Sequence, residues 1–173
     1  FDEDDEDAPQ ADAVLARWLK VNEIPDTGLL LEAAAVIIEP PRWESFTPEW
    51  LHYLVPQARA SGAIVIMDEM IFGGRMAMGG ATELYGLFPD MCCYGKAIGN
   101  GAPIACIVGN EVLKEHGALV SGTFSGDALA LDALCFTLDA YQRESVIDWM
   151  LARGRQLQRG LQSVCAPYPW AIS

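Results

Sequence analysis

Lys96 is the residue of this chain best suited to covalent chemistry. It has Gly95 before it and Gly99 and Gly101 after it, and it closely follows the apolar run 91–94. An amine placed after a short predicted strand and flanked by glycines can be approached closely by a flat ligand. Such a lysine can form a Schiff base with an aldehyde.

A carboxylate is expected at the same edge of the predicted sheet. Residues 64–67 are apolar and mostly β-branched, which predicts a buried strand, and Asp68 and Glu69 follow them. In open α/β sheets, ligands bind outside the carboxyl ends of the strands. Asp68 and Lys96 are therefore expected to meet at that end of the sheet.

An acid and an amine at one sheet edge suit pyridoxal 5'-phosphate, which needs a lysine for its aldehyde and an anion facing its pyridine nitrogen. Asp68 would keep that nitrogen protonated, and Lys96 would move a proton between substrate and cofactor carbons. Hydroxyls and glycine amides in 121–126, just before a predicted helix, could bind the phosphate. Structural roles stay open, because Asp68 could simply end its strand and Thr123 could cap the helix.

The order of these motifs resembles that of the class III aminotransferases, with the glutamate-1-semialdehyde aminomutase branch as the closest match. The resemblance extends from about Ala34 to Tyr141. It rests on motifs at 36–40, 67–70, 74–75, 89–90, 95–103 and 122–126. It implies an enzyme with pyridoxal 5'-phosphate as cofactor and an amine or amino acid and a carbonyl acceptor as substrates.

The resemblance also implies roles for individual residues. Lys96 would be the Schiff-base lysine, and Asp68 the partner of the pyridine nitrogen. Met70 would pack on one face of the cofactor ring, and Thr123 would reach the phosphate of the neighbouring subunit's cofactor. These roles imply a homodimer with a shared active site.

The sequence departs from the family pattern in ways that leave alternatives open. Glu44 falls where many members carry a substrate-gating glutamate and where aminomutases tend to carry asparagine, which favours transamination. The chain is much shorter than members of the family, and neither a phosphate cradle nor a stacking aromatic ring precedes Ala34. The chain is therefore expected to need further segments for full activity. A 2,1-aminomutase, and a non-catalytic truncated half that assembles with a complementary chain, remain alternatives to the aminotransferase.

Strand and helix signals alternate along the chain, which predicts an α/β fold with a three-layer, mostly parallel sheet flanked by helices. The resemblance makes this sheet part of the large domain of the PLP-dependent transferase fold, fold type I. We expect strands at 34–39, 64–69, 91–94 and 104–108, a turn at 25–28, and helices at 8–20, 47–61, 81–86, 127–141 and 145–164. The expected divisions are an acidic N-terminal segment and helix (1–33), a PLP-binding portion (34–141) and the helical start of a small, truncated C-terminal domain (142–173).

Composition excludes several other classes of protein. The 173 residues are 51% hydrophobic, which suffices for one substantial core. The net charge of −13, with six acidic residues at 2–7, opposes binding to nucleic acid or to an anionic membrane. No apolar stretch approaches the ~18 residues of a membrane span.

Cysteine and histidine usage points to a reducing compartment without a metal site. The five cysteines are odd in number, and two of them are adjacent in an apolar run, which favours buried thiols over a disulfide framework. His52 and His116 lie far apart and have no ligand-spaced partner. We therefore expect a cytoplasmic protein that binds no metal.

Overall fold

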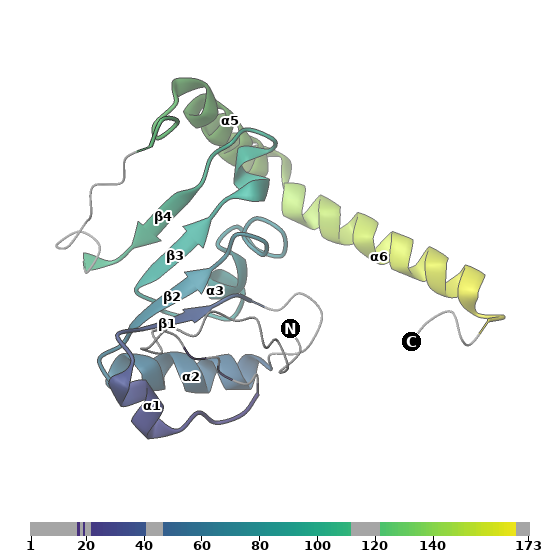
Figure 1. Ribbon diagram of the computed structural model, residues 1–173. Helices are drawn as coiled ribbons and strands as arrows, with labels where there is room; N and C mark the ends of the chain where they lie inside the picture. Colours follow the sequence, from purple (N-terminus) through teal and green to yellow (C-terminus); the bar gives the residue numbers. More distant parts are fainter. Residues whose placement is uncertain (1–16, 18, 20–21, 41–46, 112–121, 169–173) are drawn as a thin grey trace, which may run out of the picture.

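A four-stranded sheet forms the centre of the computed structural model, which describes residues 17, 19, 22–40, 47–111 and 122–168 (Figure 1). The strands are β1 (Ala35–Ile38), β2 (Ile64–Asp68), β3 (Met91–Tyr94) and β4 (Cys106–Gly109), in the order β1-β2-β3-β4. The pairs β1–β2 and β2–β3 are parallel, and β4 runs antiparallel to β3. This arrangement confirms the predicted α/β fold with a mostly parallel sheet flanked by helices.

The helical segments in the described ranges are α1 (Thr27–Glu32), α2 (Pro48–Ala60), α3 (Gly80–Leu84), η1 (Lys96–Gly99), α5 (Ala128–Glu144) and α6 (Val146–Cys165). Helix α2, predicted at 47–61, forms the crossover between the parallel strands β1 and β2. The Thr47 hydroxyl accepts a hydrogen bond from the Trp50 amide at 3.2 Å, and Pro48 occupies the first turn, where its missing N–H costs nothing.

The structure corrects one local prediction and shifts the start of another element. The expected turn at 25–28 is the start of helix α1, in which Asp26 accepts a hydrogen bond from the Gly28 amide at 3.0 Å and acts as the N-cap. Turns and helix starts favour the same residues, and here the leucines that follow continue as a helix. The predicted strand at 104–108 begins later, at Cys106, because Ala102 and Ile104 donate backbone hydrogen bonds within turns. Most of the predicted helix at 8–20, and the acidic run 2–7, lie outside the described residues.

The core occupies one face of the sheet. Alternate strand residues point into it, namely Val36, Ile38, Val65, Met67 and Cys92, and they pack against the buried face of α2, formed by Trp50, Leu51, Leu54, Val55 and Ala58. The strand registers place Ile37 and Ile107 on the other face, where their side chains are 69% and 53% exposed. The sheet is therefore well covered by the described residues on one side only.

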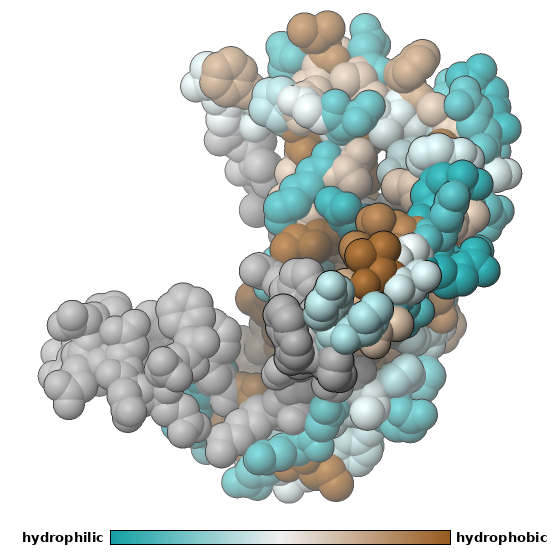
Figure 2. All heavy atoms as spheres, turned by 90° about the vertical axis from the view of Figure 1, so that its right-hand side faces the viewer, coloured by the Kyte–Doolittle hydropathy of each residue, from teal (hydrophilic) through white to brown (hydrophobic). Residues whose placement is uncertain are grey.

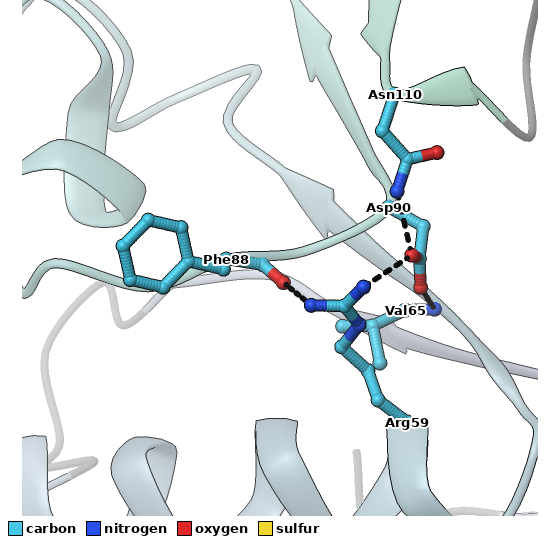
Figure 3. Close-up of polar contacts among 5 residues, drawn as sticks. All are labelled: Arg59, Val65, Phe88, Asp90 and Asn110. Carbon is cyan, nitrogen blue, oxygen red and sulfur yellow. Dashed lines mark hydrogen bonds and ion pairs between the residues drawn. The ribbon is translucent and has the colours of Figure 1, made fainter.

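A buried aspartate pins the amino ends of the parallel strands (Figure 3). Asp90 lies just before β3, and one of its carboxylate oxygens accepts a hydrogen bond from the Val65 amide of β2 at 2.9 Å. The other oxygen accepts from the Asn110 side chain at 2.8 Å and pairs with the Arg59 guanidinium at 3.3 Å. Arg59 also donates to the Phe88 carbonyl at 3.0 Å. Asp90 thus ties α2, β2 and the end of β4 to the start of β3.

Helix α6 extends away from the sheet beyond the end of α5 (Figure 1). The two helices are joined at Ser145, whose φ of 49° lies in the left-handed region. None of the residues of α6 is buried, and its exposed apolar side chains include Trp149, Leu157, Leu161 and Val164. Figure 2 shows apolar side chains among polar ones on the side toward which α6 projects. Within the described ranges, every helix is too short or too polar to cross a bilayer.

Candidate active site

The sheet brings Asp68 and Lys96 to the same edge. Asp68 is the last residue of β2 and is in register with Cys93 of the parallel neighbour β3. Strand β3 ends at Tyr94, and Lys96 follows two residues later as the first residue of η1. Because parallel strands end on the same side of a sheet, the carboxylate and the amine both lie at the edge where α/β proteins bind ligands.

The Asp68 carboxylate is oriented by the backbone that follows it. Its Oδ1 atom accepts a hydrogen bond from the Met70 amide at 3.0 Å. This aspartate turn ends the strand, so the structural role considered for Asp68 is present. The same bond fixes the direction of the half-buried carboxylate at the sheet edge.

Lys96 has an unusual backbone and an exposed side chain. Its φ of 47° lies in the left-handed region, which costs a non-glycine residue about 1–2 kcal/mol. Strain of this kind persists where the surrounding structure imposes it, and it is concentrated at functional sites. The backbone of Lys96 is therefore held in place by its surroundings.

Met70 lies against the glycine that precedes the lysine. A Cβ atom added to Gly95 would lie 2.5 Å from the Cε atom of Met70 and 2.7 Å from its Sδ atom. A side chain at position 95 would therefore require the flexible end of Met70 to move. The predicted site residues Asp68, Met70 and Lys96 thus lie together where the neighbouring strands β2 and β3 end.

Tyr94 fixes the end of β3 to the loop before α3. Its hydroxyl donates a hydrogen bond to the Gly79 carbonyl at 3.1 Å. Burial raises the pKa of Tyr94 above its ordinary value, and the neighbouring Cys92 thiol raises it further. The hydroxyl therefore stays protonated and keeps its role as a donor.

Glu69 is the site residue to which the sequence analysis assigned no role. It is fully buried, and its carboxylate accepts hydrogen bonds from the Ala81 amide at 3.0 Å and from the Thr82 amide and hydroxyl, both at 2.7 Å. The alternation of buried residues along the strand could have indicated that Glu69 is buried. Val65 and Met67 point into the core, so the next residue on that face is Glu69. A carboxylate on a buried face needs dedicated donors.

Thr123 is not joined to this edge. Thr123 is exposed in the turn before α5, and Asp127 rather than Thr123 caps that helix, accepting from the Ala130 amide at 2.9 Å. Helix α5 meets the site region near its other end, where a Cβ on Gly74 would lie 3.6 Å from the Tyr141 hydroxyl. Glu44 lies outside the described residues.

The cysteines give little sign of nucleophilic chemistry. All five are free thiols, and Cys92 alone among them is buried, whereas Cys135 is exposed, so the prediction of buried thiols was correct only in part. Burial raises the pKa values of Cys92, Cys93 and Cys106 above the ordinary thiol value. A raised pKa keeps a thiol protonated and weakly reactive. The described ranges contain no cluster of three His, Cys, Asp or Glu side chains that could hold a metal ion.

A pocket of about 410 Å³ lies at the other end of β3. Its lining includes Arg59, Phe88, Asp90, Met91 and Asn110. The arginine there is already bonded to the Asp90 carboxylate and to a backbone carbonyl. This pocket therefore lies away from Lys96. The charged group in its wall, the Arg59 guanidinium, has a structural role.

Comparison with known proteins identifies the fold and the family. The family model described as aminotransferase class-III matches residues 10–172. The chain is similar to the FumI protein of Sphingopyxis sp. MTA144, solved in its PLP internal aldimine form, with a TM-score of 0.73 and 26% identity over 79% of this chain and 35% of that one. It is also similar to an omega-transaminase from Sphaerobacter thermophilus, with a TM-score of 0.66 and 28% identity over 77% of this chain and 33% of that one.

A third similar structure is the ornithine delta-aminotransferase of Plasmodium falciparum. The TM-score is 0.70 over 81% of this chain and 39% of that one, and at 21% identity the likeness is one of fold. The chain spans about a third of the length of the FumI protein and of the omega-transaminase. The match of the family model over residues 10–172 shows that this chain belongs to the class III aminotransferase family.

Proposed function

We propose that this chain supplies the lysine and the aspartate with which a pyridoxal-phosphate-dependent aminotransferase holds its cofactor. Lys96 binds the aldehyde of pyridoxal 5'-phosphate covalently, and Asp68 faces the pyridine nitrogen and keeps it protonated. The observation that carries the proposal is the shared edge of β2 and β3, where both residues lie at the carboxyl ends of neighbouring parallel strands. Membership of the class III family supports it.

The side chains at this edge fit such a cofactor. The Asp68 carboxylate is held in one direction by the Met70 amide, and the exposed Lys96 amine is accessible to an aldehyde. When bound, pyridoxal phosphate supplies an electron sink for charge that develops on the substrate carbon. Lys96 Nζ would be the group that takes a proton from that carbon and returns it. The reaction would move an amino group between an amine or amino acid and a carbonyl acceptor.

Chemical trapping tests the role of Lys96 directly. The sequence contains three lysines, Lys20, Lys96 and Lys114, so two of them serve as internal controls. Borohydride reduction in the presence of pyridoxal phosphate fixes the cofactor to the lysine that holds it, and peptide mass spectrometry then locates the adduct. We expect a saturable adduct on Lys96, lost together with the visible absorbance in Lys96→Ala. Equal labelling of all three lysines would contradict the proposal.

The role of Asp68 can be tested against a closely matched aspartate. Asp26 accepts a hydrogen bond from the amide two residues on at 3.0 Å, as Asp68 does, but it caps α1 instead of ending β2. We expect Asp68→Asn to weaken binding of pyridoxal phosphate at least tenfold, about 1.4 kcal/mol. Asp26→Asn should bind the cofactor as the parent does. Similar affinities for the two variants would refute the assignment of Asp68.

We propose finer features from the resemblance alone. Thr123 reaches the cofactor phosphate of a second subunit in a homodimer, Glu44 gates the substrate, and α6 begins a small domain over 142–173. We propose transamination, rather than 2,1-aminomutase chemistry, as the reaction. Product analysis with a single substrate separates the two reactions, because an aminomutase moves the amino group within one molecule and an aminotransferase needs a second substrate.

A second candidate function is assembly with another polypeptide, as a non-catalytic half. It is favoured by the exposed apolar face of the sheet, where Ile37 and Ile107 are more than half accessible. Apolar surface of this kind is typical of interaction sites. Sedimentation of the parent should show association, weakened in Ile37→Lys and unchanged in Ile24→Lys, which alters an exposed isoleucine before α1. A stable monomer without affinity for pyridoxal phosphate would contradict both candidate functions.

A further inference from the structure

We propose that Glu69 is a positioning residue for the cofactor site: its buried carboxylate locks the end of β2 to the start of α3 and thereby fixes the direction of Asp68. This inference rests on the proposed function, because it assigns Glu69 a task only if Asp68 faces the cofactor. Glu69 itself touches neither substrate nor cofactor.

The contacts of Glu69 are unusually complete for a buried carboxylate. The residue has no exposed surface, and three donors converge on it, the Ala81 amide on Oε2 and the Thr82 amide and hydroxyl on Oε1. Space for the group comes from Gly80, because a Cβ atom there would collide with the Glu69 carboxylate. A negative group beside the first amides of a helix also interacts favourably with the positive end of the helix dipole.

The contacts around Glu69 extend to both strands that carry the site. The Glu69 carbonyl accepts from the Gly73 amide at 2.8 Å, so the backbone after β2 is held as well as the side chain. The Thr82 hydroxyl lies 3.7 Å from the Cys92 sulfur of β3. The Tyr94 hydroxyl bonds to the Gly79 carbonyl at 3.1 Å. The segment 69–82 is thus attached to the ends of β2 and β3 together.

Because Glu69 directly follows Asp68 in the chain, the hydrogen bonds that hold Glu69 also restrict Asp68. Successive residues of a strand point to opposite faces, so a glutamate fixed in the core orients the peptide unit from which the Asp68 side chain leaves. A neutral replacement would disturb this arrangement. The amide of a glutamine has one acceptor oxygen, and its NH₂ group would face a backbone N–H or the Thr82 hydroxyl.

The test compares Glu69→Gln with Glu83→Gln. Glu83 belongs to the same short helix and accepts from the Gly79 amide at 2.6 Å, but it is exposed and this hydrogen bond stays within the segment 79–84. Binding of pyridoxal phosphate and the wavelength of its absorbance are measured by titration, and thermal unfolding is measured without cofactor. We expect Glu69→Gln to bind roughly tenfold more weakly, within the range known for residues that orient metal ligands. Its absorbance should shift, and Glu83→Gln should match the parent.

A double-mutant cycle separates positioning from stability. If Glu69 acts through Asp68, adding Glu69→Gln to Asp68→Asn should cause little further loss of cofactor affinity. A purely structural role would instead lower the melting temperature of the cofactor-free chain, with cofactor affinity and absorbance as in the parent. That result, or fully additive losses in the cycle, would overturn the inference.

Two milder variants keep the inference testable if Glu69→Gln does not fold. Thr82→Val removes the hydroxyl that donates to Glu69 and should weaken cofactor binding about threefold, less than Glu69→Gln because two of the three donors remain, whereas Thr82→Ser should restore it. Parent-like affinity in Thr82→Val would then overturn the inference. Absence of cofactor binding in the parent would refute the proposed function itself, and the inference with it.

Discussion

Replacing Asp90 tests how firmly the strands that carry Asp68 and Lys96 are held together. In Asp90→Ala, the fully buried Val65 loses the acceptor of its amide, and Asn110 loses a 2.8 Å hydrogen bond. A hydrogen bond to an ionised group contributes about 1.5–3 kcal/mol. Asn110 is exposed and can bond to water instead, so the Val65 amide dominates the cost. We expect a loss of about 3 kcal/mol in the free energy of unfolding.

The ion pair between Arg59 and Asp90 gives a control for this prediction. The Arg59 side chain is 45% exposed, and exposed ion pairs contribute about 0–1 kcal/mol. Arg59→Met should therefore cost at most about 1 kcal/mol, much less than Asp90→Ala. Urea unfolding followed by the fluorescence of the buried Trp50 measures both changes. At an m-value of about 2 kcal/mol/M, Asp90→Ala should lower the midpoint by ~1.5 M. Equal losses in the two variants would refute the reasoning.

Two further predictions concern the loop and strand beside the site. Gly80→Ala combines a positive φ with a collision against the Glu69 carboxylate and should lower the free energy of unfolding by about 3 kcal/mol. Gly62→Ala, with a positive φ and open space, should lower it by about 1–2 kcal/mol. Equal losses on urea unfolding would contradict this. The raised pKa of Tyr94 gives stability that is fully present below the ordinary tyrosine value of about 10 and is lost as the pH rises above it. Urea unfolding should therefore show a smaller alkaline loss for Tyr94→Phe than for the parent, and equal losses would contradict this.

The elements of the fold could be predicted where the signal is local. Thr47 and Pro48 start α2 as their residue types predict, and β3 occupies 91–94 as its apolar run predicts. The parallel pairing of β1 and β2 also followed from the sequence, because a helical crossover between neighbouring strands makes them parallel.

Features that depend on distant residues could not be predicted. Glu69 finds its partners twelve and thirteen residues away, and Asp90 binds an amide 25 residues before it. Neither spacing has a repeating pattern in the sequence. The left-handed backbone of Lys96 also escaped prediction, because a lysine carries no preference for that region and tertiary contacts must impose it.

The two carboxylates at the end of β2 make the register between β2 and β3 critical for the proposed site. Asp68 faces the sheet edge and Glu69 the core, so a slip of one residue between β2 and β3 would exchange them, burying the proposed cofactor ligand and exposing the anchor. Asp90 holds the amino ends of these strands, and Glu69 holds their carboxyl ends through α3. The position of Asp68 relative to Lys96 is therefore fixed from both ends of a short strand pair, and the two anchors do this with buried carboxylates that make no use of the reactive edge.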